Sequence, residues 1–297
     1  MNGSLTIAIP FYRGLDYLAS AIESVLAQER PDWKLEVFDD SGQNGEIGEL
    51  VGSYDDPRVA YDRNERNLGM VPNWNRCIDR AETDLVALLH ADDRLEPDYV
   101  AAMLDLAERH SDAAAYFCDA RIIDARGRRR FSFADATKRF FAPRGEREYV
   151  LRGQSAVRAL MRGNFIMCPT LCFRKSVLGA NRFSDSWEQV QDLELTTRLL
   201  LQGMSLVGTM RTAYAYRRHE KSATSRQSES LLRFDEEFRL FDQVAARAEE
   251  LGWSDVARLS RRKTIVRLHL LYRIVRDVAI LRPTKALEKL RFLLTRR

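Results

Sequence analysis

The residues of this chain best suited to chemistry follow the end of an apolar run. The stretch LVALLHADDR, residues 85–94, passes from apolar residues into His90 and then into two adjacent carboxylates, Asp92 and Asp93. Apolar runs of this length usually form strands that are buried on both faces. Two neighbouring acids at the edge of a core repel each other, so they need a counter-charge, which water or a bound cation can supply.

Two other apolar runs also finish in polar groups. The run LTIAI is followed by Pro10 and Tyr12, and KLEVFDD ends in Asp39 and Asp40. In open parallel sheets, ligands bind beyond the carboxyl ends of the strands. Carboxylates that converge there can hold Mg²⁺ or Mn²⁺, which take one or two carboxylates plus phosphate oxygens of a ligand. Each stretch alone also suits an ordinary turn, because Asp, Ser and Gly are favoured in turns.

The elements that must position these acids alternate between strand and helix patterns through about residue 120. Helical spacing of apolar residues recurs between the apolar runs, which predicts a parallel, doubly wound sheet. Further along, we expect a mobile loop over Phe131–Tyr149, strands over 170–178 and 205–219, and a helix over 190–203. Helices follow after about Arg226, so we expect an α/β domain over residues 1–225 and a helical extension over residues 226–297.

Composition fits a protein of the cytoplasm. Of the 297 residues, 45% are hydrophobic and 30% are charged, enough to bury a sizeable core. The start of the chain does not resemble a signal peptide, and no run reaches the roughly 18 apolar residues of a membrane helix. Among the four cysteines, Cys168 and Cys172 would stand about 13 Å apart in a strand, too far for a disulfide. We expect free thiols in a reducing compartment.

The extension is strongly basic. Residues 258–297 carry thirteen arginine and lysine residues against two acids, a local charge of +11, so the remainder carries −7 within the net +4. The stretch TIVRLHLLYRIVRDVAIL has one apolar face, made of Ile265, Leu268, Leu271, Tyr272 and Val275. Such a helix can lie on an anionic membrane. It can equally pack on the rest of the chain or on a second subunit.

Common cofactor and hydrolase motifs are missing from the sequence. There is no G-x-G-x-x-G after the first apolar run, no G-x-x-x-x-G-K-[ST] and no G-x-S-x-G. The four histidines are dispersed, which disfavours a zinc site. These absences argue against a dinucleotide-binding turn, a P-loop and a serine hydrolase.

The chain resembles the family 2 glycosyltransferases. The matching stretches are TIAIPFYRGLDYLASAIESVLAQ, LEVFDDSG, NERNLGMVPNWNRCIDRAETDLVALLHADDRLEPDYV and VQDLELTTRLLLQG. They cover roughly residues 5–110 and 160–225 in the family's order and spacing. The resemblance implies a GT-A-type, Rossmann-like, mixed and mostly parallel sheet flanked by helices, with a C-terminal helical extension. It identifies residues 1–225 as the catalytic domain.

The resemblance also implies roles for individual residues. Six positions match those that hold the nucleotide or run past it: Pro10, Tyr12, Asp39, Asp40, Asn67 and Gly69. Asp92 and Asp93 match the acids that touch the ribose and carry a divalent metal, Mn²⁺ or Mg²⁺, on the diphosphate. Asp192 matches the general base. His219 and Ser222 resemble a closing segment that can reach the diphosphate, and His219 is a further candidate metal ligand.

Two positions depart from the family pattern. His90 stands where the family often has an aspartate, so the site should carry one negative charge fewer. Gln191 replaces the glutamate that usually precedes the base; glutamine keeps the hydrogen bonding but removes a charge that would raise the pKa of the base.

The implied reaction is an inverting sugar transfer from a nucleoside diphosphate sugar, UDP by default, to a hydroxyl of a glycan or lipid-linked acceptor in bacterial surface polysaccharide synthesis. We expect a cytoplasmic enzyme, with peripheral contact to the inner face of the membrane left open, and no nucleic acid partner. A nucleotidyltransferase is the enzymatic alternative, but PFYRGLDYL is not its glycine-rich loop. A non-catalytic nucleotide-sugar-binding relative is the other, and the retained acids argue against it.

Overall fold

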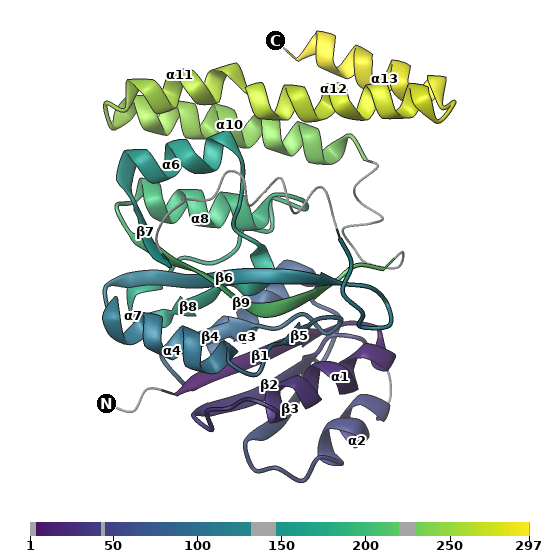
Figure 1. The fold of residues 1–297 in the computed structure, drawn as a ribbon, viewed down its shortest axis with the longest axis vertical. Helices are drawn as coiled ribbons and strands as arrows, with labels where there is room; N and C mark the ends of the chain where they lie inside the picture. Colours follow the sequence, from purple (N-terminus) through teal and green to yellow (C-terminus); the bar gives the residue numbers. More distant parts are fainter. Residues whose placement is uncertain (1–3, 43–44, 132–146, 220–229, 297) are drawn as a thin grey trace.

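The computed structural model describes residues 4–42, 45–131, 147–219 and 230–296. Its sheet begins with four neighbouring parallel strands in the order β3-β2-β1-β4 (Figure 1). Their bounds are Leu5–Phe11 for β1, Trp33–Asp39 for β2, Val59–Arg63 for β3 and Leu85–Leu88 for β4. The largely buried apolar side chains of β1, β2 and β4 explain why these runs become strands covered by helices on both faces, whereas β3, at the end of the sheet, is only partly buried.

The rest of the sheet is mixed. β8 pairs antiparallel with both β4 and β6, and the long strands β6 and β9 pair parallel to each other. β5 and β7 pair antiparallel with β9. The bounds are Arg94–Leu95 for β5, Ala113–Ile123 for β6, Glu148–Arg152 for β7, Cys172–Arg174 for β8 and Ser205–Arg217 for β9. The predicted mixed, mostly parallel sheet is confirmed.

Helices cover both faces and give two hydrophobic cores. One core lies under α1 (Leu15–Leu26), α2 (Glu46–Gly52) and α4 (Tyr99–Arg109). The other lies under α3 (Met70–Arg80), α6 (Gly153–Arg162) and α8 (Gln191–Leu201). The short helix α7 (Lys175–Leu178) follows β8.

The C-terminal helices form an outer layer on the second core (Figure 1). They are α10 (Leu232–Glu250), α11 (Ser254–Arg262), α12 (Thr264–Ala279) and α13 (Pro283–Thr295). Phe234, Phe238 and Phe241 of α10 join the same buried cluster as Leu195 and Leu199 of α8. The extension and the α/β part therefore share a core. Within the described residues, no helix is both long and apolar enough to span a bilayer.

Three expectations are corrected. The strand expected over 170–178 is limited to β8, Cys172–Arg174, because residues 175–178 form α7 instead. The loop expected over Phe131–Tyr149 is wrong at its end, since β7 begins at Glu148; residues 132–146 lie outside the described part. Cys168 lies in a 3-10 turn, Cys168–Thr170, rather than in a strand with Cys172, and all four thiols are free as expected.

The contact between α10 and α12 predicts a pH dependence of stability. Burial lowers the pKa of His269, and the charges of Arg233, Arg273 and Arg276 add to the shift, so that the pKa falls to about 4. The folded chain therefore keeps His269 neutral, while the unfolded chain protonates it below its ordinary pKa of about 6.5. We expect the free energy of unfolding to fall by up to roughly 3 kcal/mol from pH 6.5 to 4. Urea unfolding of His269→Gln should show a shallower fall; an identical slope would contradict this assignment.

Candidate active site

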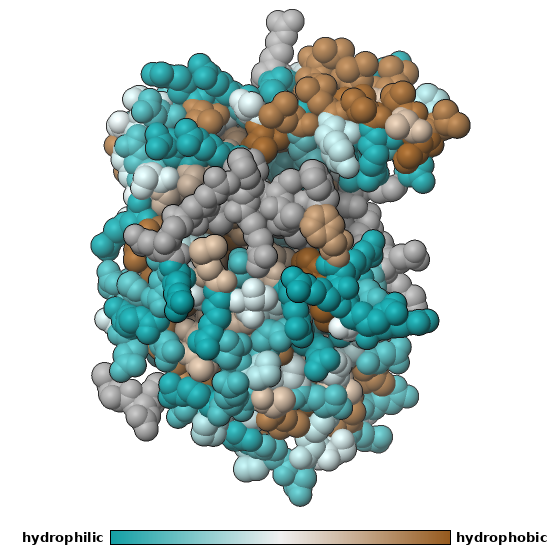
Figure 2. Space-filling view, in the orientation of Figure 1, coloured by the Kyte–Doolittle hydropathy of each residue, from teal (hydrophilic) through white to brown (hydrophobic). Residues whose placement is uncertain are grey.

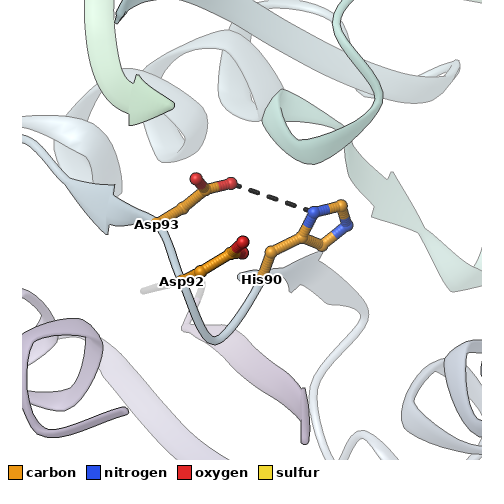
Figure 3. A group of neighbouring side chains, drawn as sticks. All are labelled: His90, Asp92 and Asp93. Atoms are coloured by element: carbon orange, nitrogen blue, oxygen red, sulfur yellow. Dashed lines mark ion pairs between the residues drawn. The ribbon is translucent and has the colours of Figure 1, made fainter. Parts of the chain in front are cut away.

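The sequence positions three candidate ligands on one turn after β4. Leu88 pairs with Ala8 and the amide of Leu89 donates to the Ala8 carbonyl at 2.9 Å, so this turn begins beside Pro10 of β1. His90, Asp92 and Asp93 place a ring nitrogen and two carboxylate oxygens within 4.8 Å of one another. Figure 3 shows their side chains converging, with Nδ1 of His90 3.8 Å from Oδ2 of Asp93.

Asp93 is the buried member of the cluster. Its side chain is 0% exposed. Oδ2 accepts a hydrogen bond from the Tyr214 hydroxyl at 2.9 Å, and Oδ1 accepts one from the backbone N–H of Arg217 at 2.7 Å. Burial raises the pKa of Asp93 well above its usual range, and the charge of Asp92 adds to that rise. A nearby cation would offset both effects.

Asp92 is the open member, with 33% of its side chain exposed. Nε2 of His219 lies 2.9 Å from its Oδ2, so the structure brings together two residues 127 positions apart. The Arg217 guanidinium holds the same turn, because its Nε donates to the Asp92 carbonyl at 2.6 Å. Tyr17 packs against both, with its ring 5.1 Å from the His219 ring and 4.8 Å from the Arg217 guanidinium carbon. Ser222 lies outside the described residues.

His90 has the protonation state that a metal ligand needs. Its ring stacks on Trp74 at 5.4 Å. Burial lowers the pKa of His90, while the charges of Asp92 and Asp192 partly oppose that shift. The imidazole is therefore neutral near pH 7 and keeps a lone pair on one nitrogen. Together with two carboxylates, this donor set fits a divalent cation.

Asp40 is engaged within the protein. Its Oδ1 accepts from the Leu68 N–H at 2.6 Å and from Asn64 Nδ2 at 2.8 Å. Its Oδ2 accepts from the Gly69 N–H at 2.9 Å and from Asn67 Nδ2 at 3.1 Å. Gly69 has a φ of 90°, a conformation that favours glycine. The acid thus ties the 67–69 loop to the end of β2, and a base contact by Asp40 itself stays a prediction.

The other expected nucleotide positions differ in exposure. Asp39 is fully buried, and its oxygens accept from the Ser41 N–H at 2.8 Å and the Tyr61 hydroxyl at 2.7 Å. Tyr12, directly after β1, is 55% exposed and can be reached by a ligand. Tyr12 therefore has a surface free for stacking, whereas Asp39 supports the strand end.

Asp192 lies in the first turn of α8, where the helix dipole favours a negative charge. Nδ2 of Asn164 lies 3.4 Å from its Oδ2. Its charge acts both on His90, in the cluster, and on Arg233, in α10. The structure therefore brings the expected base electrostatically close to the expected metal ligands. Gln191, the departure from the family pattern, is buried beside it.

Residues 6–179, more than half of the chain, match the family described as Glycosyl transferase family 2. The chain belongs to glycosyl transferase family 2. The predicted family is thereby confirmed.

Two curated proteins illustrate how far the family 2 likeness extends in sequence. The succinoglycan biosynthesis protein ExoO of Rhizobium meliloti is 31% identical over 135 residues, which are 45% of this chain and 38% of ExoO. An uncharacterised protein of Sinorhizobium fredii is 34% identical over 122 residues, which are 40% of this chain and 13% of that protein. This chain spans less than half the length of either relative.

Two solved structures share the fold. The 1–349 fragment of S. aureus TarS, in complex with UDP-GlcNAc, matches 86% of this chain and 70% of its own, with a TM-score of 0.63 and 14% identity. The mannosyltransferase PcManGT from Pyrobaculum calidifontis, in complex with GDP-Man and Mn²⁺, matches 98% and 87%, with a TM-score of 0.59 and 12% identity. The GT-A-type architecture expected for this family 2 chain is confirmed.

One residue near the candidate active site was not predicted from the sequence. Glu236 of α10 is buried, and its carboxylate accepts from the backbone N–H of Glu188 at 2.9 Å and of Gln189 at 2.7 Å. These residues lead directly into α8 and Asp192. Trp187 is buried beneath Arg239, whose guanidinium carbon lies 4.8 Å from the centre of the ring. The helical extension therefore positions the segment that carries the expected base.

Glu236→Gln should separate positioning from folding. An amide can accept only through its one oxygen, so one of the two N–H groups loses its partner, at a cost of about 1–3 kcal/mol. We expect kcat to fall about tenfold or more, because small misplacements of reacting groups are costly, while the donor KM changes little. Glu250→Gln, on an exposed residue of the same helix, is the matched control. A lower melting temperature with unchanged kcat would reduce Glu236 to a purely structural residue.

Proposed function

We propose that this family 2 chain transfers a sugar from a nucleoside diphosphate sugar to an acceptor hydroxyl, with inversion at the anomeric carbon. The observation that carries the proposal is that two carboxylates suited to different roles, those of Asp92 and Asp192, both lie near His90. Asp92 belongs to a cluster of potential metal ligands, and Asp192 stands at the start of α8 with its charge acting on His90 of that cluster. The reaction needs both carboxylates: one to bind the metal that stabilises the leaving group, and one to take the proton of the attacking hydroxyl.

Asp192 is the proposed general base. It would take the proton from the acceptor hydroxyl as that oxygen attacks the anomeric carbon, while the nucleoside diphosphate leaves from the opposite face. The N-terminus of α8 favours the ionised carboxylate that a base requires. A base of this kind typically contributes about 10²–10⁴ in rate.

Asp92, His90 and Asp93 are the residues that would hold Mg²⁺ or Mn²⁺. When bound, such an ion supplies positive charge that stabilises the departing diphosphate. Asp92 is the leading ligand, because a third of its side chain is exposed while both oxygens of Asp93 already accept hydrogen bonds. His219 contacts Asp92 and is the candidate contact for the diphosphate, with metal ligation as its alternative role.

Tyr12 is the proposed stacking partner of the nucleotide base. Pro10, Asn67 and Gly69 would line the nucleotide site at the same edge of the sheet. UDP remains the default nucleotide, supported by the TarS complex, and GDP is the alternative that the PcManGT complex suggests. A glycan or a lipid-linked glycan is the proposed acceptor. The succinoglycan biosynthesis relative supports a role in bacterial polysaccharide synthesis.

A binding screen tests the donor class. Thermal unfolding is followed with UDP, GDP and dTDP sugars, each with and without Mn²⁺. A donor at about one hundred times its Kd stabilises the folded chain by about 2.7 kcal/mol, a rise of about 5 °C or more. We expect one nucleotide class to give this rise only with Mn²⁺. A response to nucleoside triphosphates, without one to any nucleotide sugar, would favour a nucleotidyltransferase instead.

A further inference from the structure

The hairpin formed by α12 and α13 exposes a continuous set of large apolar side chains. We call this set the hairpin face; it consists of Leu268, Leu271, Tyr272, Val275, Val278, Ile280, Leu281, Leu287, Leu290 and Leu294. Figure 2 shows a brown patch at the upper right of the molecule, where Figure 1 places this hairpin. Contiguous exposed apolar patches of this kind mark interaction sites.

The distribution of charged and apolar side chains on the hairpin is the reverse of that on an ordinary surface helix pair. Its inner side buries an ion pair, in which Nζ of Lys289 lies 2.6 Å from Oδ2 of Asp277, with these side chains only 3% and 1% exposed. Its outer side carries leucines and valines, and Val275 is 66% exposed. Helices in water place charges outside and apolar residues inside. The reverse arrangement suits an apolar medium outside the protein.

The turn between the two helices of the hairpin also exposes apolar side chains. Ile280 and Leu281 follow the end of α12 at Ala279, and Leu281 is 88% exposed with a φ of 57°, which is uncommon for a leucine. Arg282 and Lys285 follow within four residues. An apolar tip next to cations matches the composition of segments that enter the boundary between headgroups and acyl chains.

The charge of the hairpin selects among possible partners. Residues 264–296 carry eight arginine and lysine residues against two acids, a local excess of six positive charges. Two copies that met through this face would bring like charges together, whereas a surface rich in anionic phospholipid attracts them. The exposed cations, such as Arg282 and Arg291, each contribute about 1 kcal/mol near such a surface, whereas Lys289 and Arg273 are buried.

The hairpin also lies close to the site. His269 of α12 packs on Phe234 of α10, with ring centroids 5.1 Å apart. The neighbouring Arg233 interacts electrostatically with Asp192. Two layers of helix therefore connect the hairpin face to the expected base.

We propose that the hairpin face docks on a bilayer containing anionic phospholipid, with the apolar side chains entering the headgroup boundary and the basic residues contacting lipid phosphates. Docking there would bring the site to a lipid-linked acceptor held in the same bilayer. That consequence rests on the proposed function, whereas vesicle binding itself does not require any donor sugar.

Vesicle flotation of the full chain tests the docking. Vesicles of phosphatidylcholine alone are compared with vesicles containing about 30% phosphatidylglycerol, at low and high salt. We expect binding to the anionic vesicles, weakened several-fold or more by salt. Val275→Ser together with Leu281→Ser should weaken it at least tenfold without a change in charge, because each buried CH₂ contributes about 0.8 kcal/mol. Met210→Ser, on an exposed apolar residue of β9, should bind like the wild type.

Three outcomes would overturn the docking proposal. The first is no binding to either vesicle. The second is equal binding by the double variant. The third is a lipid-free dimer in sedimentation velocity that the double variant converts to monomer, since the face would then belong to a second copy. An unchanged thermal unfolding curve verifies that the double variant is folded. Loss of donor turnover with intact vesicle binding would count only against the proposed reaction.

Discussion

Asp192→Asn is expected to lower kcat by about 10²–10⁴ while leaving donor binding nearly unchanged. Asparagine keeps the size and the hydrogen bonding of aspartate, but it cannot take the proton of the acceptor hydroxyl. The contact from Asn164 can be retained through the amide oxygen, so the start of α8 should keep its conformation. Steady-state kinetics with a cognate donor and acceptor, compared with a donor-binding isotherm, separates the two effects.

Asp185→Asn provides the matched control for this substitution. Asp185 is an exposed acid seven residues earlier, and its replacement changes the net charge by the same amount. We expect this variant to retain the kcat of the wild type. A similar loss of kcat in both variants would attribute the effect to overall charge, and wild-type kcat in Asp192→Asn would remove Asp192 from the mechanism.

Asp92→Asn is expected to give the second large effect, a loss of Mn²⁺ affinity together with a fall in kcat on the order of 10²–10³. The substitution removes the partly exposed carboxylate of the cluster and leaves the buried hydrogen bonds of Asp93 to Tyr214 and Arg217 in place. Asp93→Asn would be a poorer test, since it disturbs those buried bonds. Mn²⁺ titration followed by electron paramagnetic resonance, with and without UDP, measures the affinity directly.

His90→Asp should act in the opposite direction on the same readout. It supplies the third acid of the family pattern and adds a negative charge beside Asp92, so Mn²⁺ should bind more tightly. A weaker or unchanged Mn²⁺ affinity in this variant would contradict that expectation. It would show that the His90 ring, which stacks on Trp74, matters more to the site than the missing negative charge.

Much of the site could be predicted from the sequence because it depends on local features. An apolar run that becomes a parallel strand delivers the residues after it to the carboxyl edge of the sheet. His90 and Asp92 are therefore located by the strand that precedes them.

The remainder depends on contacts between residues far apart in the chain. Nothing in the types of Glu236 and Gln189 indicates that a helix of the extension holds the segment before Asp192. Asp40 was expected to face a ligand, but the amides of Leu68 and Gly69 lie around it. In α12, helical spacing correctly placed Leu268 and Val275 on one face, while Ile265 packs against the core, since only the tertiary contacts decide where that face ends.

The most direct test of the proposed reaction is the release of nucleoside diphosphate from a panel of UDP, GDP and dTDP sugars, measured with Mn²⁺ and again with EDTA. We expect at least one donor to be turned over, with turnover abolished by EDTA, restored by Mn²⁺ and reduced at least about 10²-fold in Asp192→Asn. Turnover that persists in EDTA and in Asp192→Asn, or no turnover of any donor by the wild-type chain with acceptor lipids supplied, would contradict the proposed chemistry.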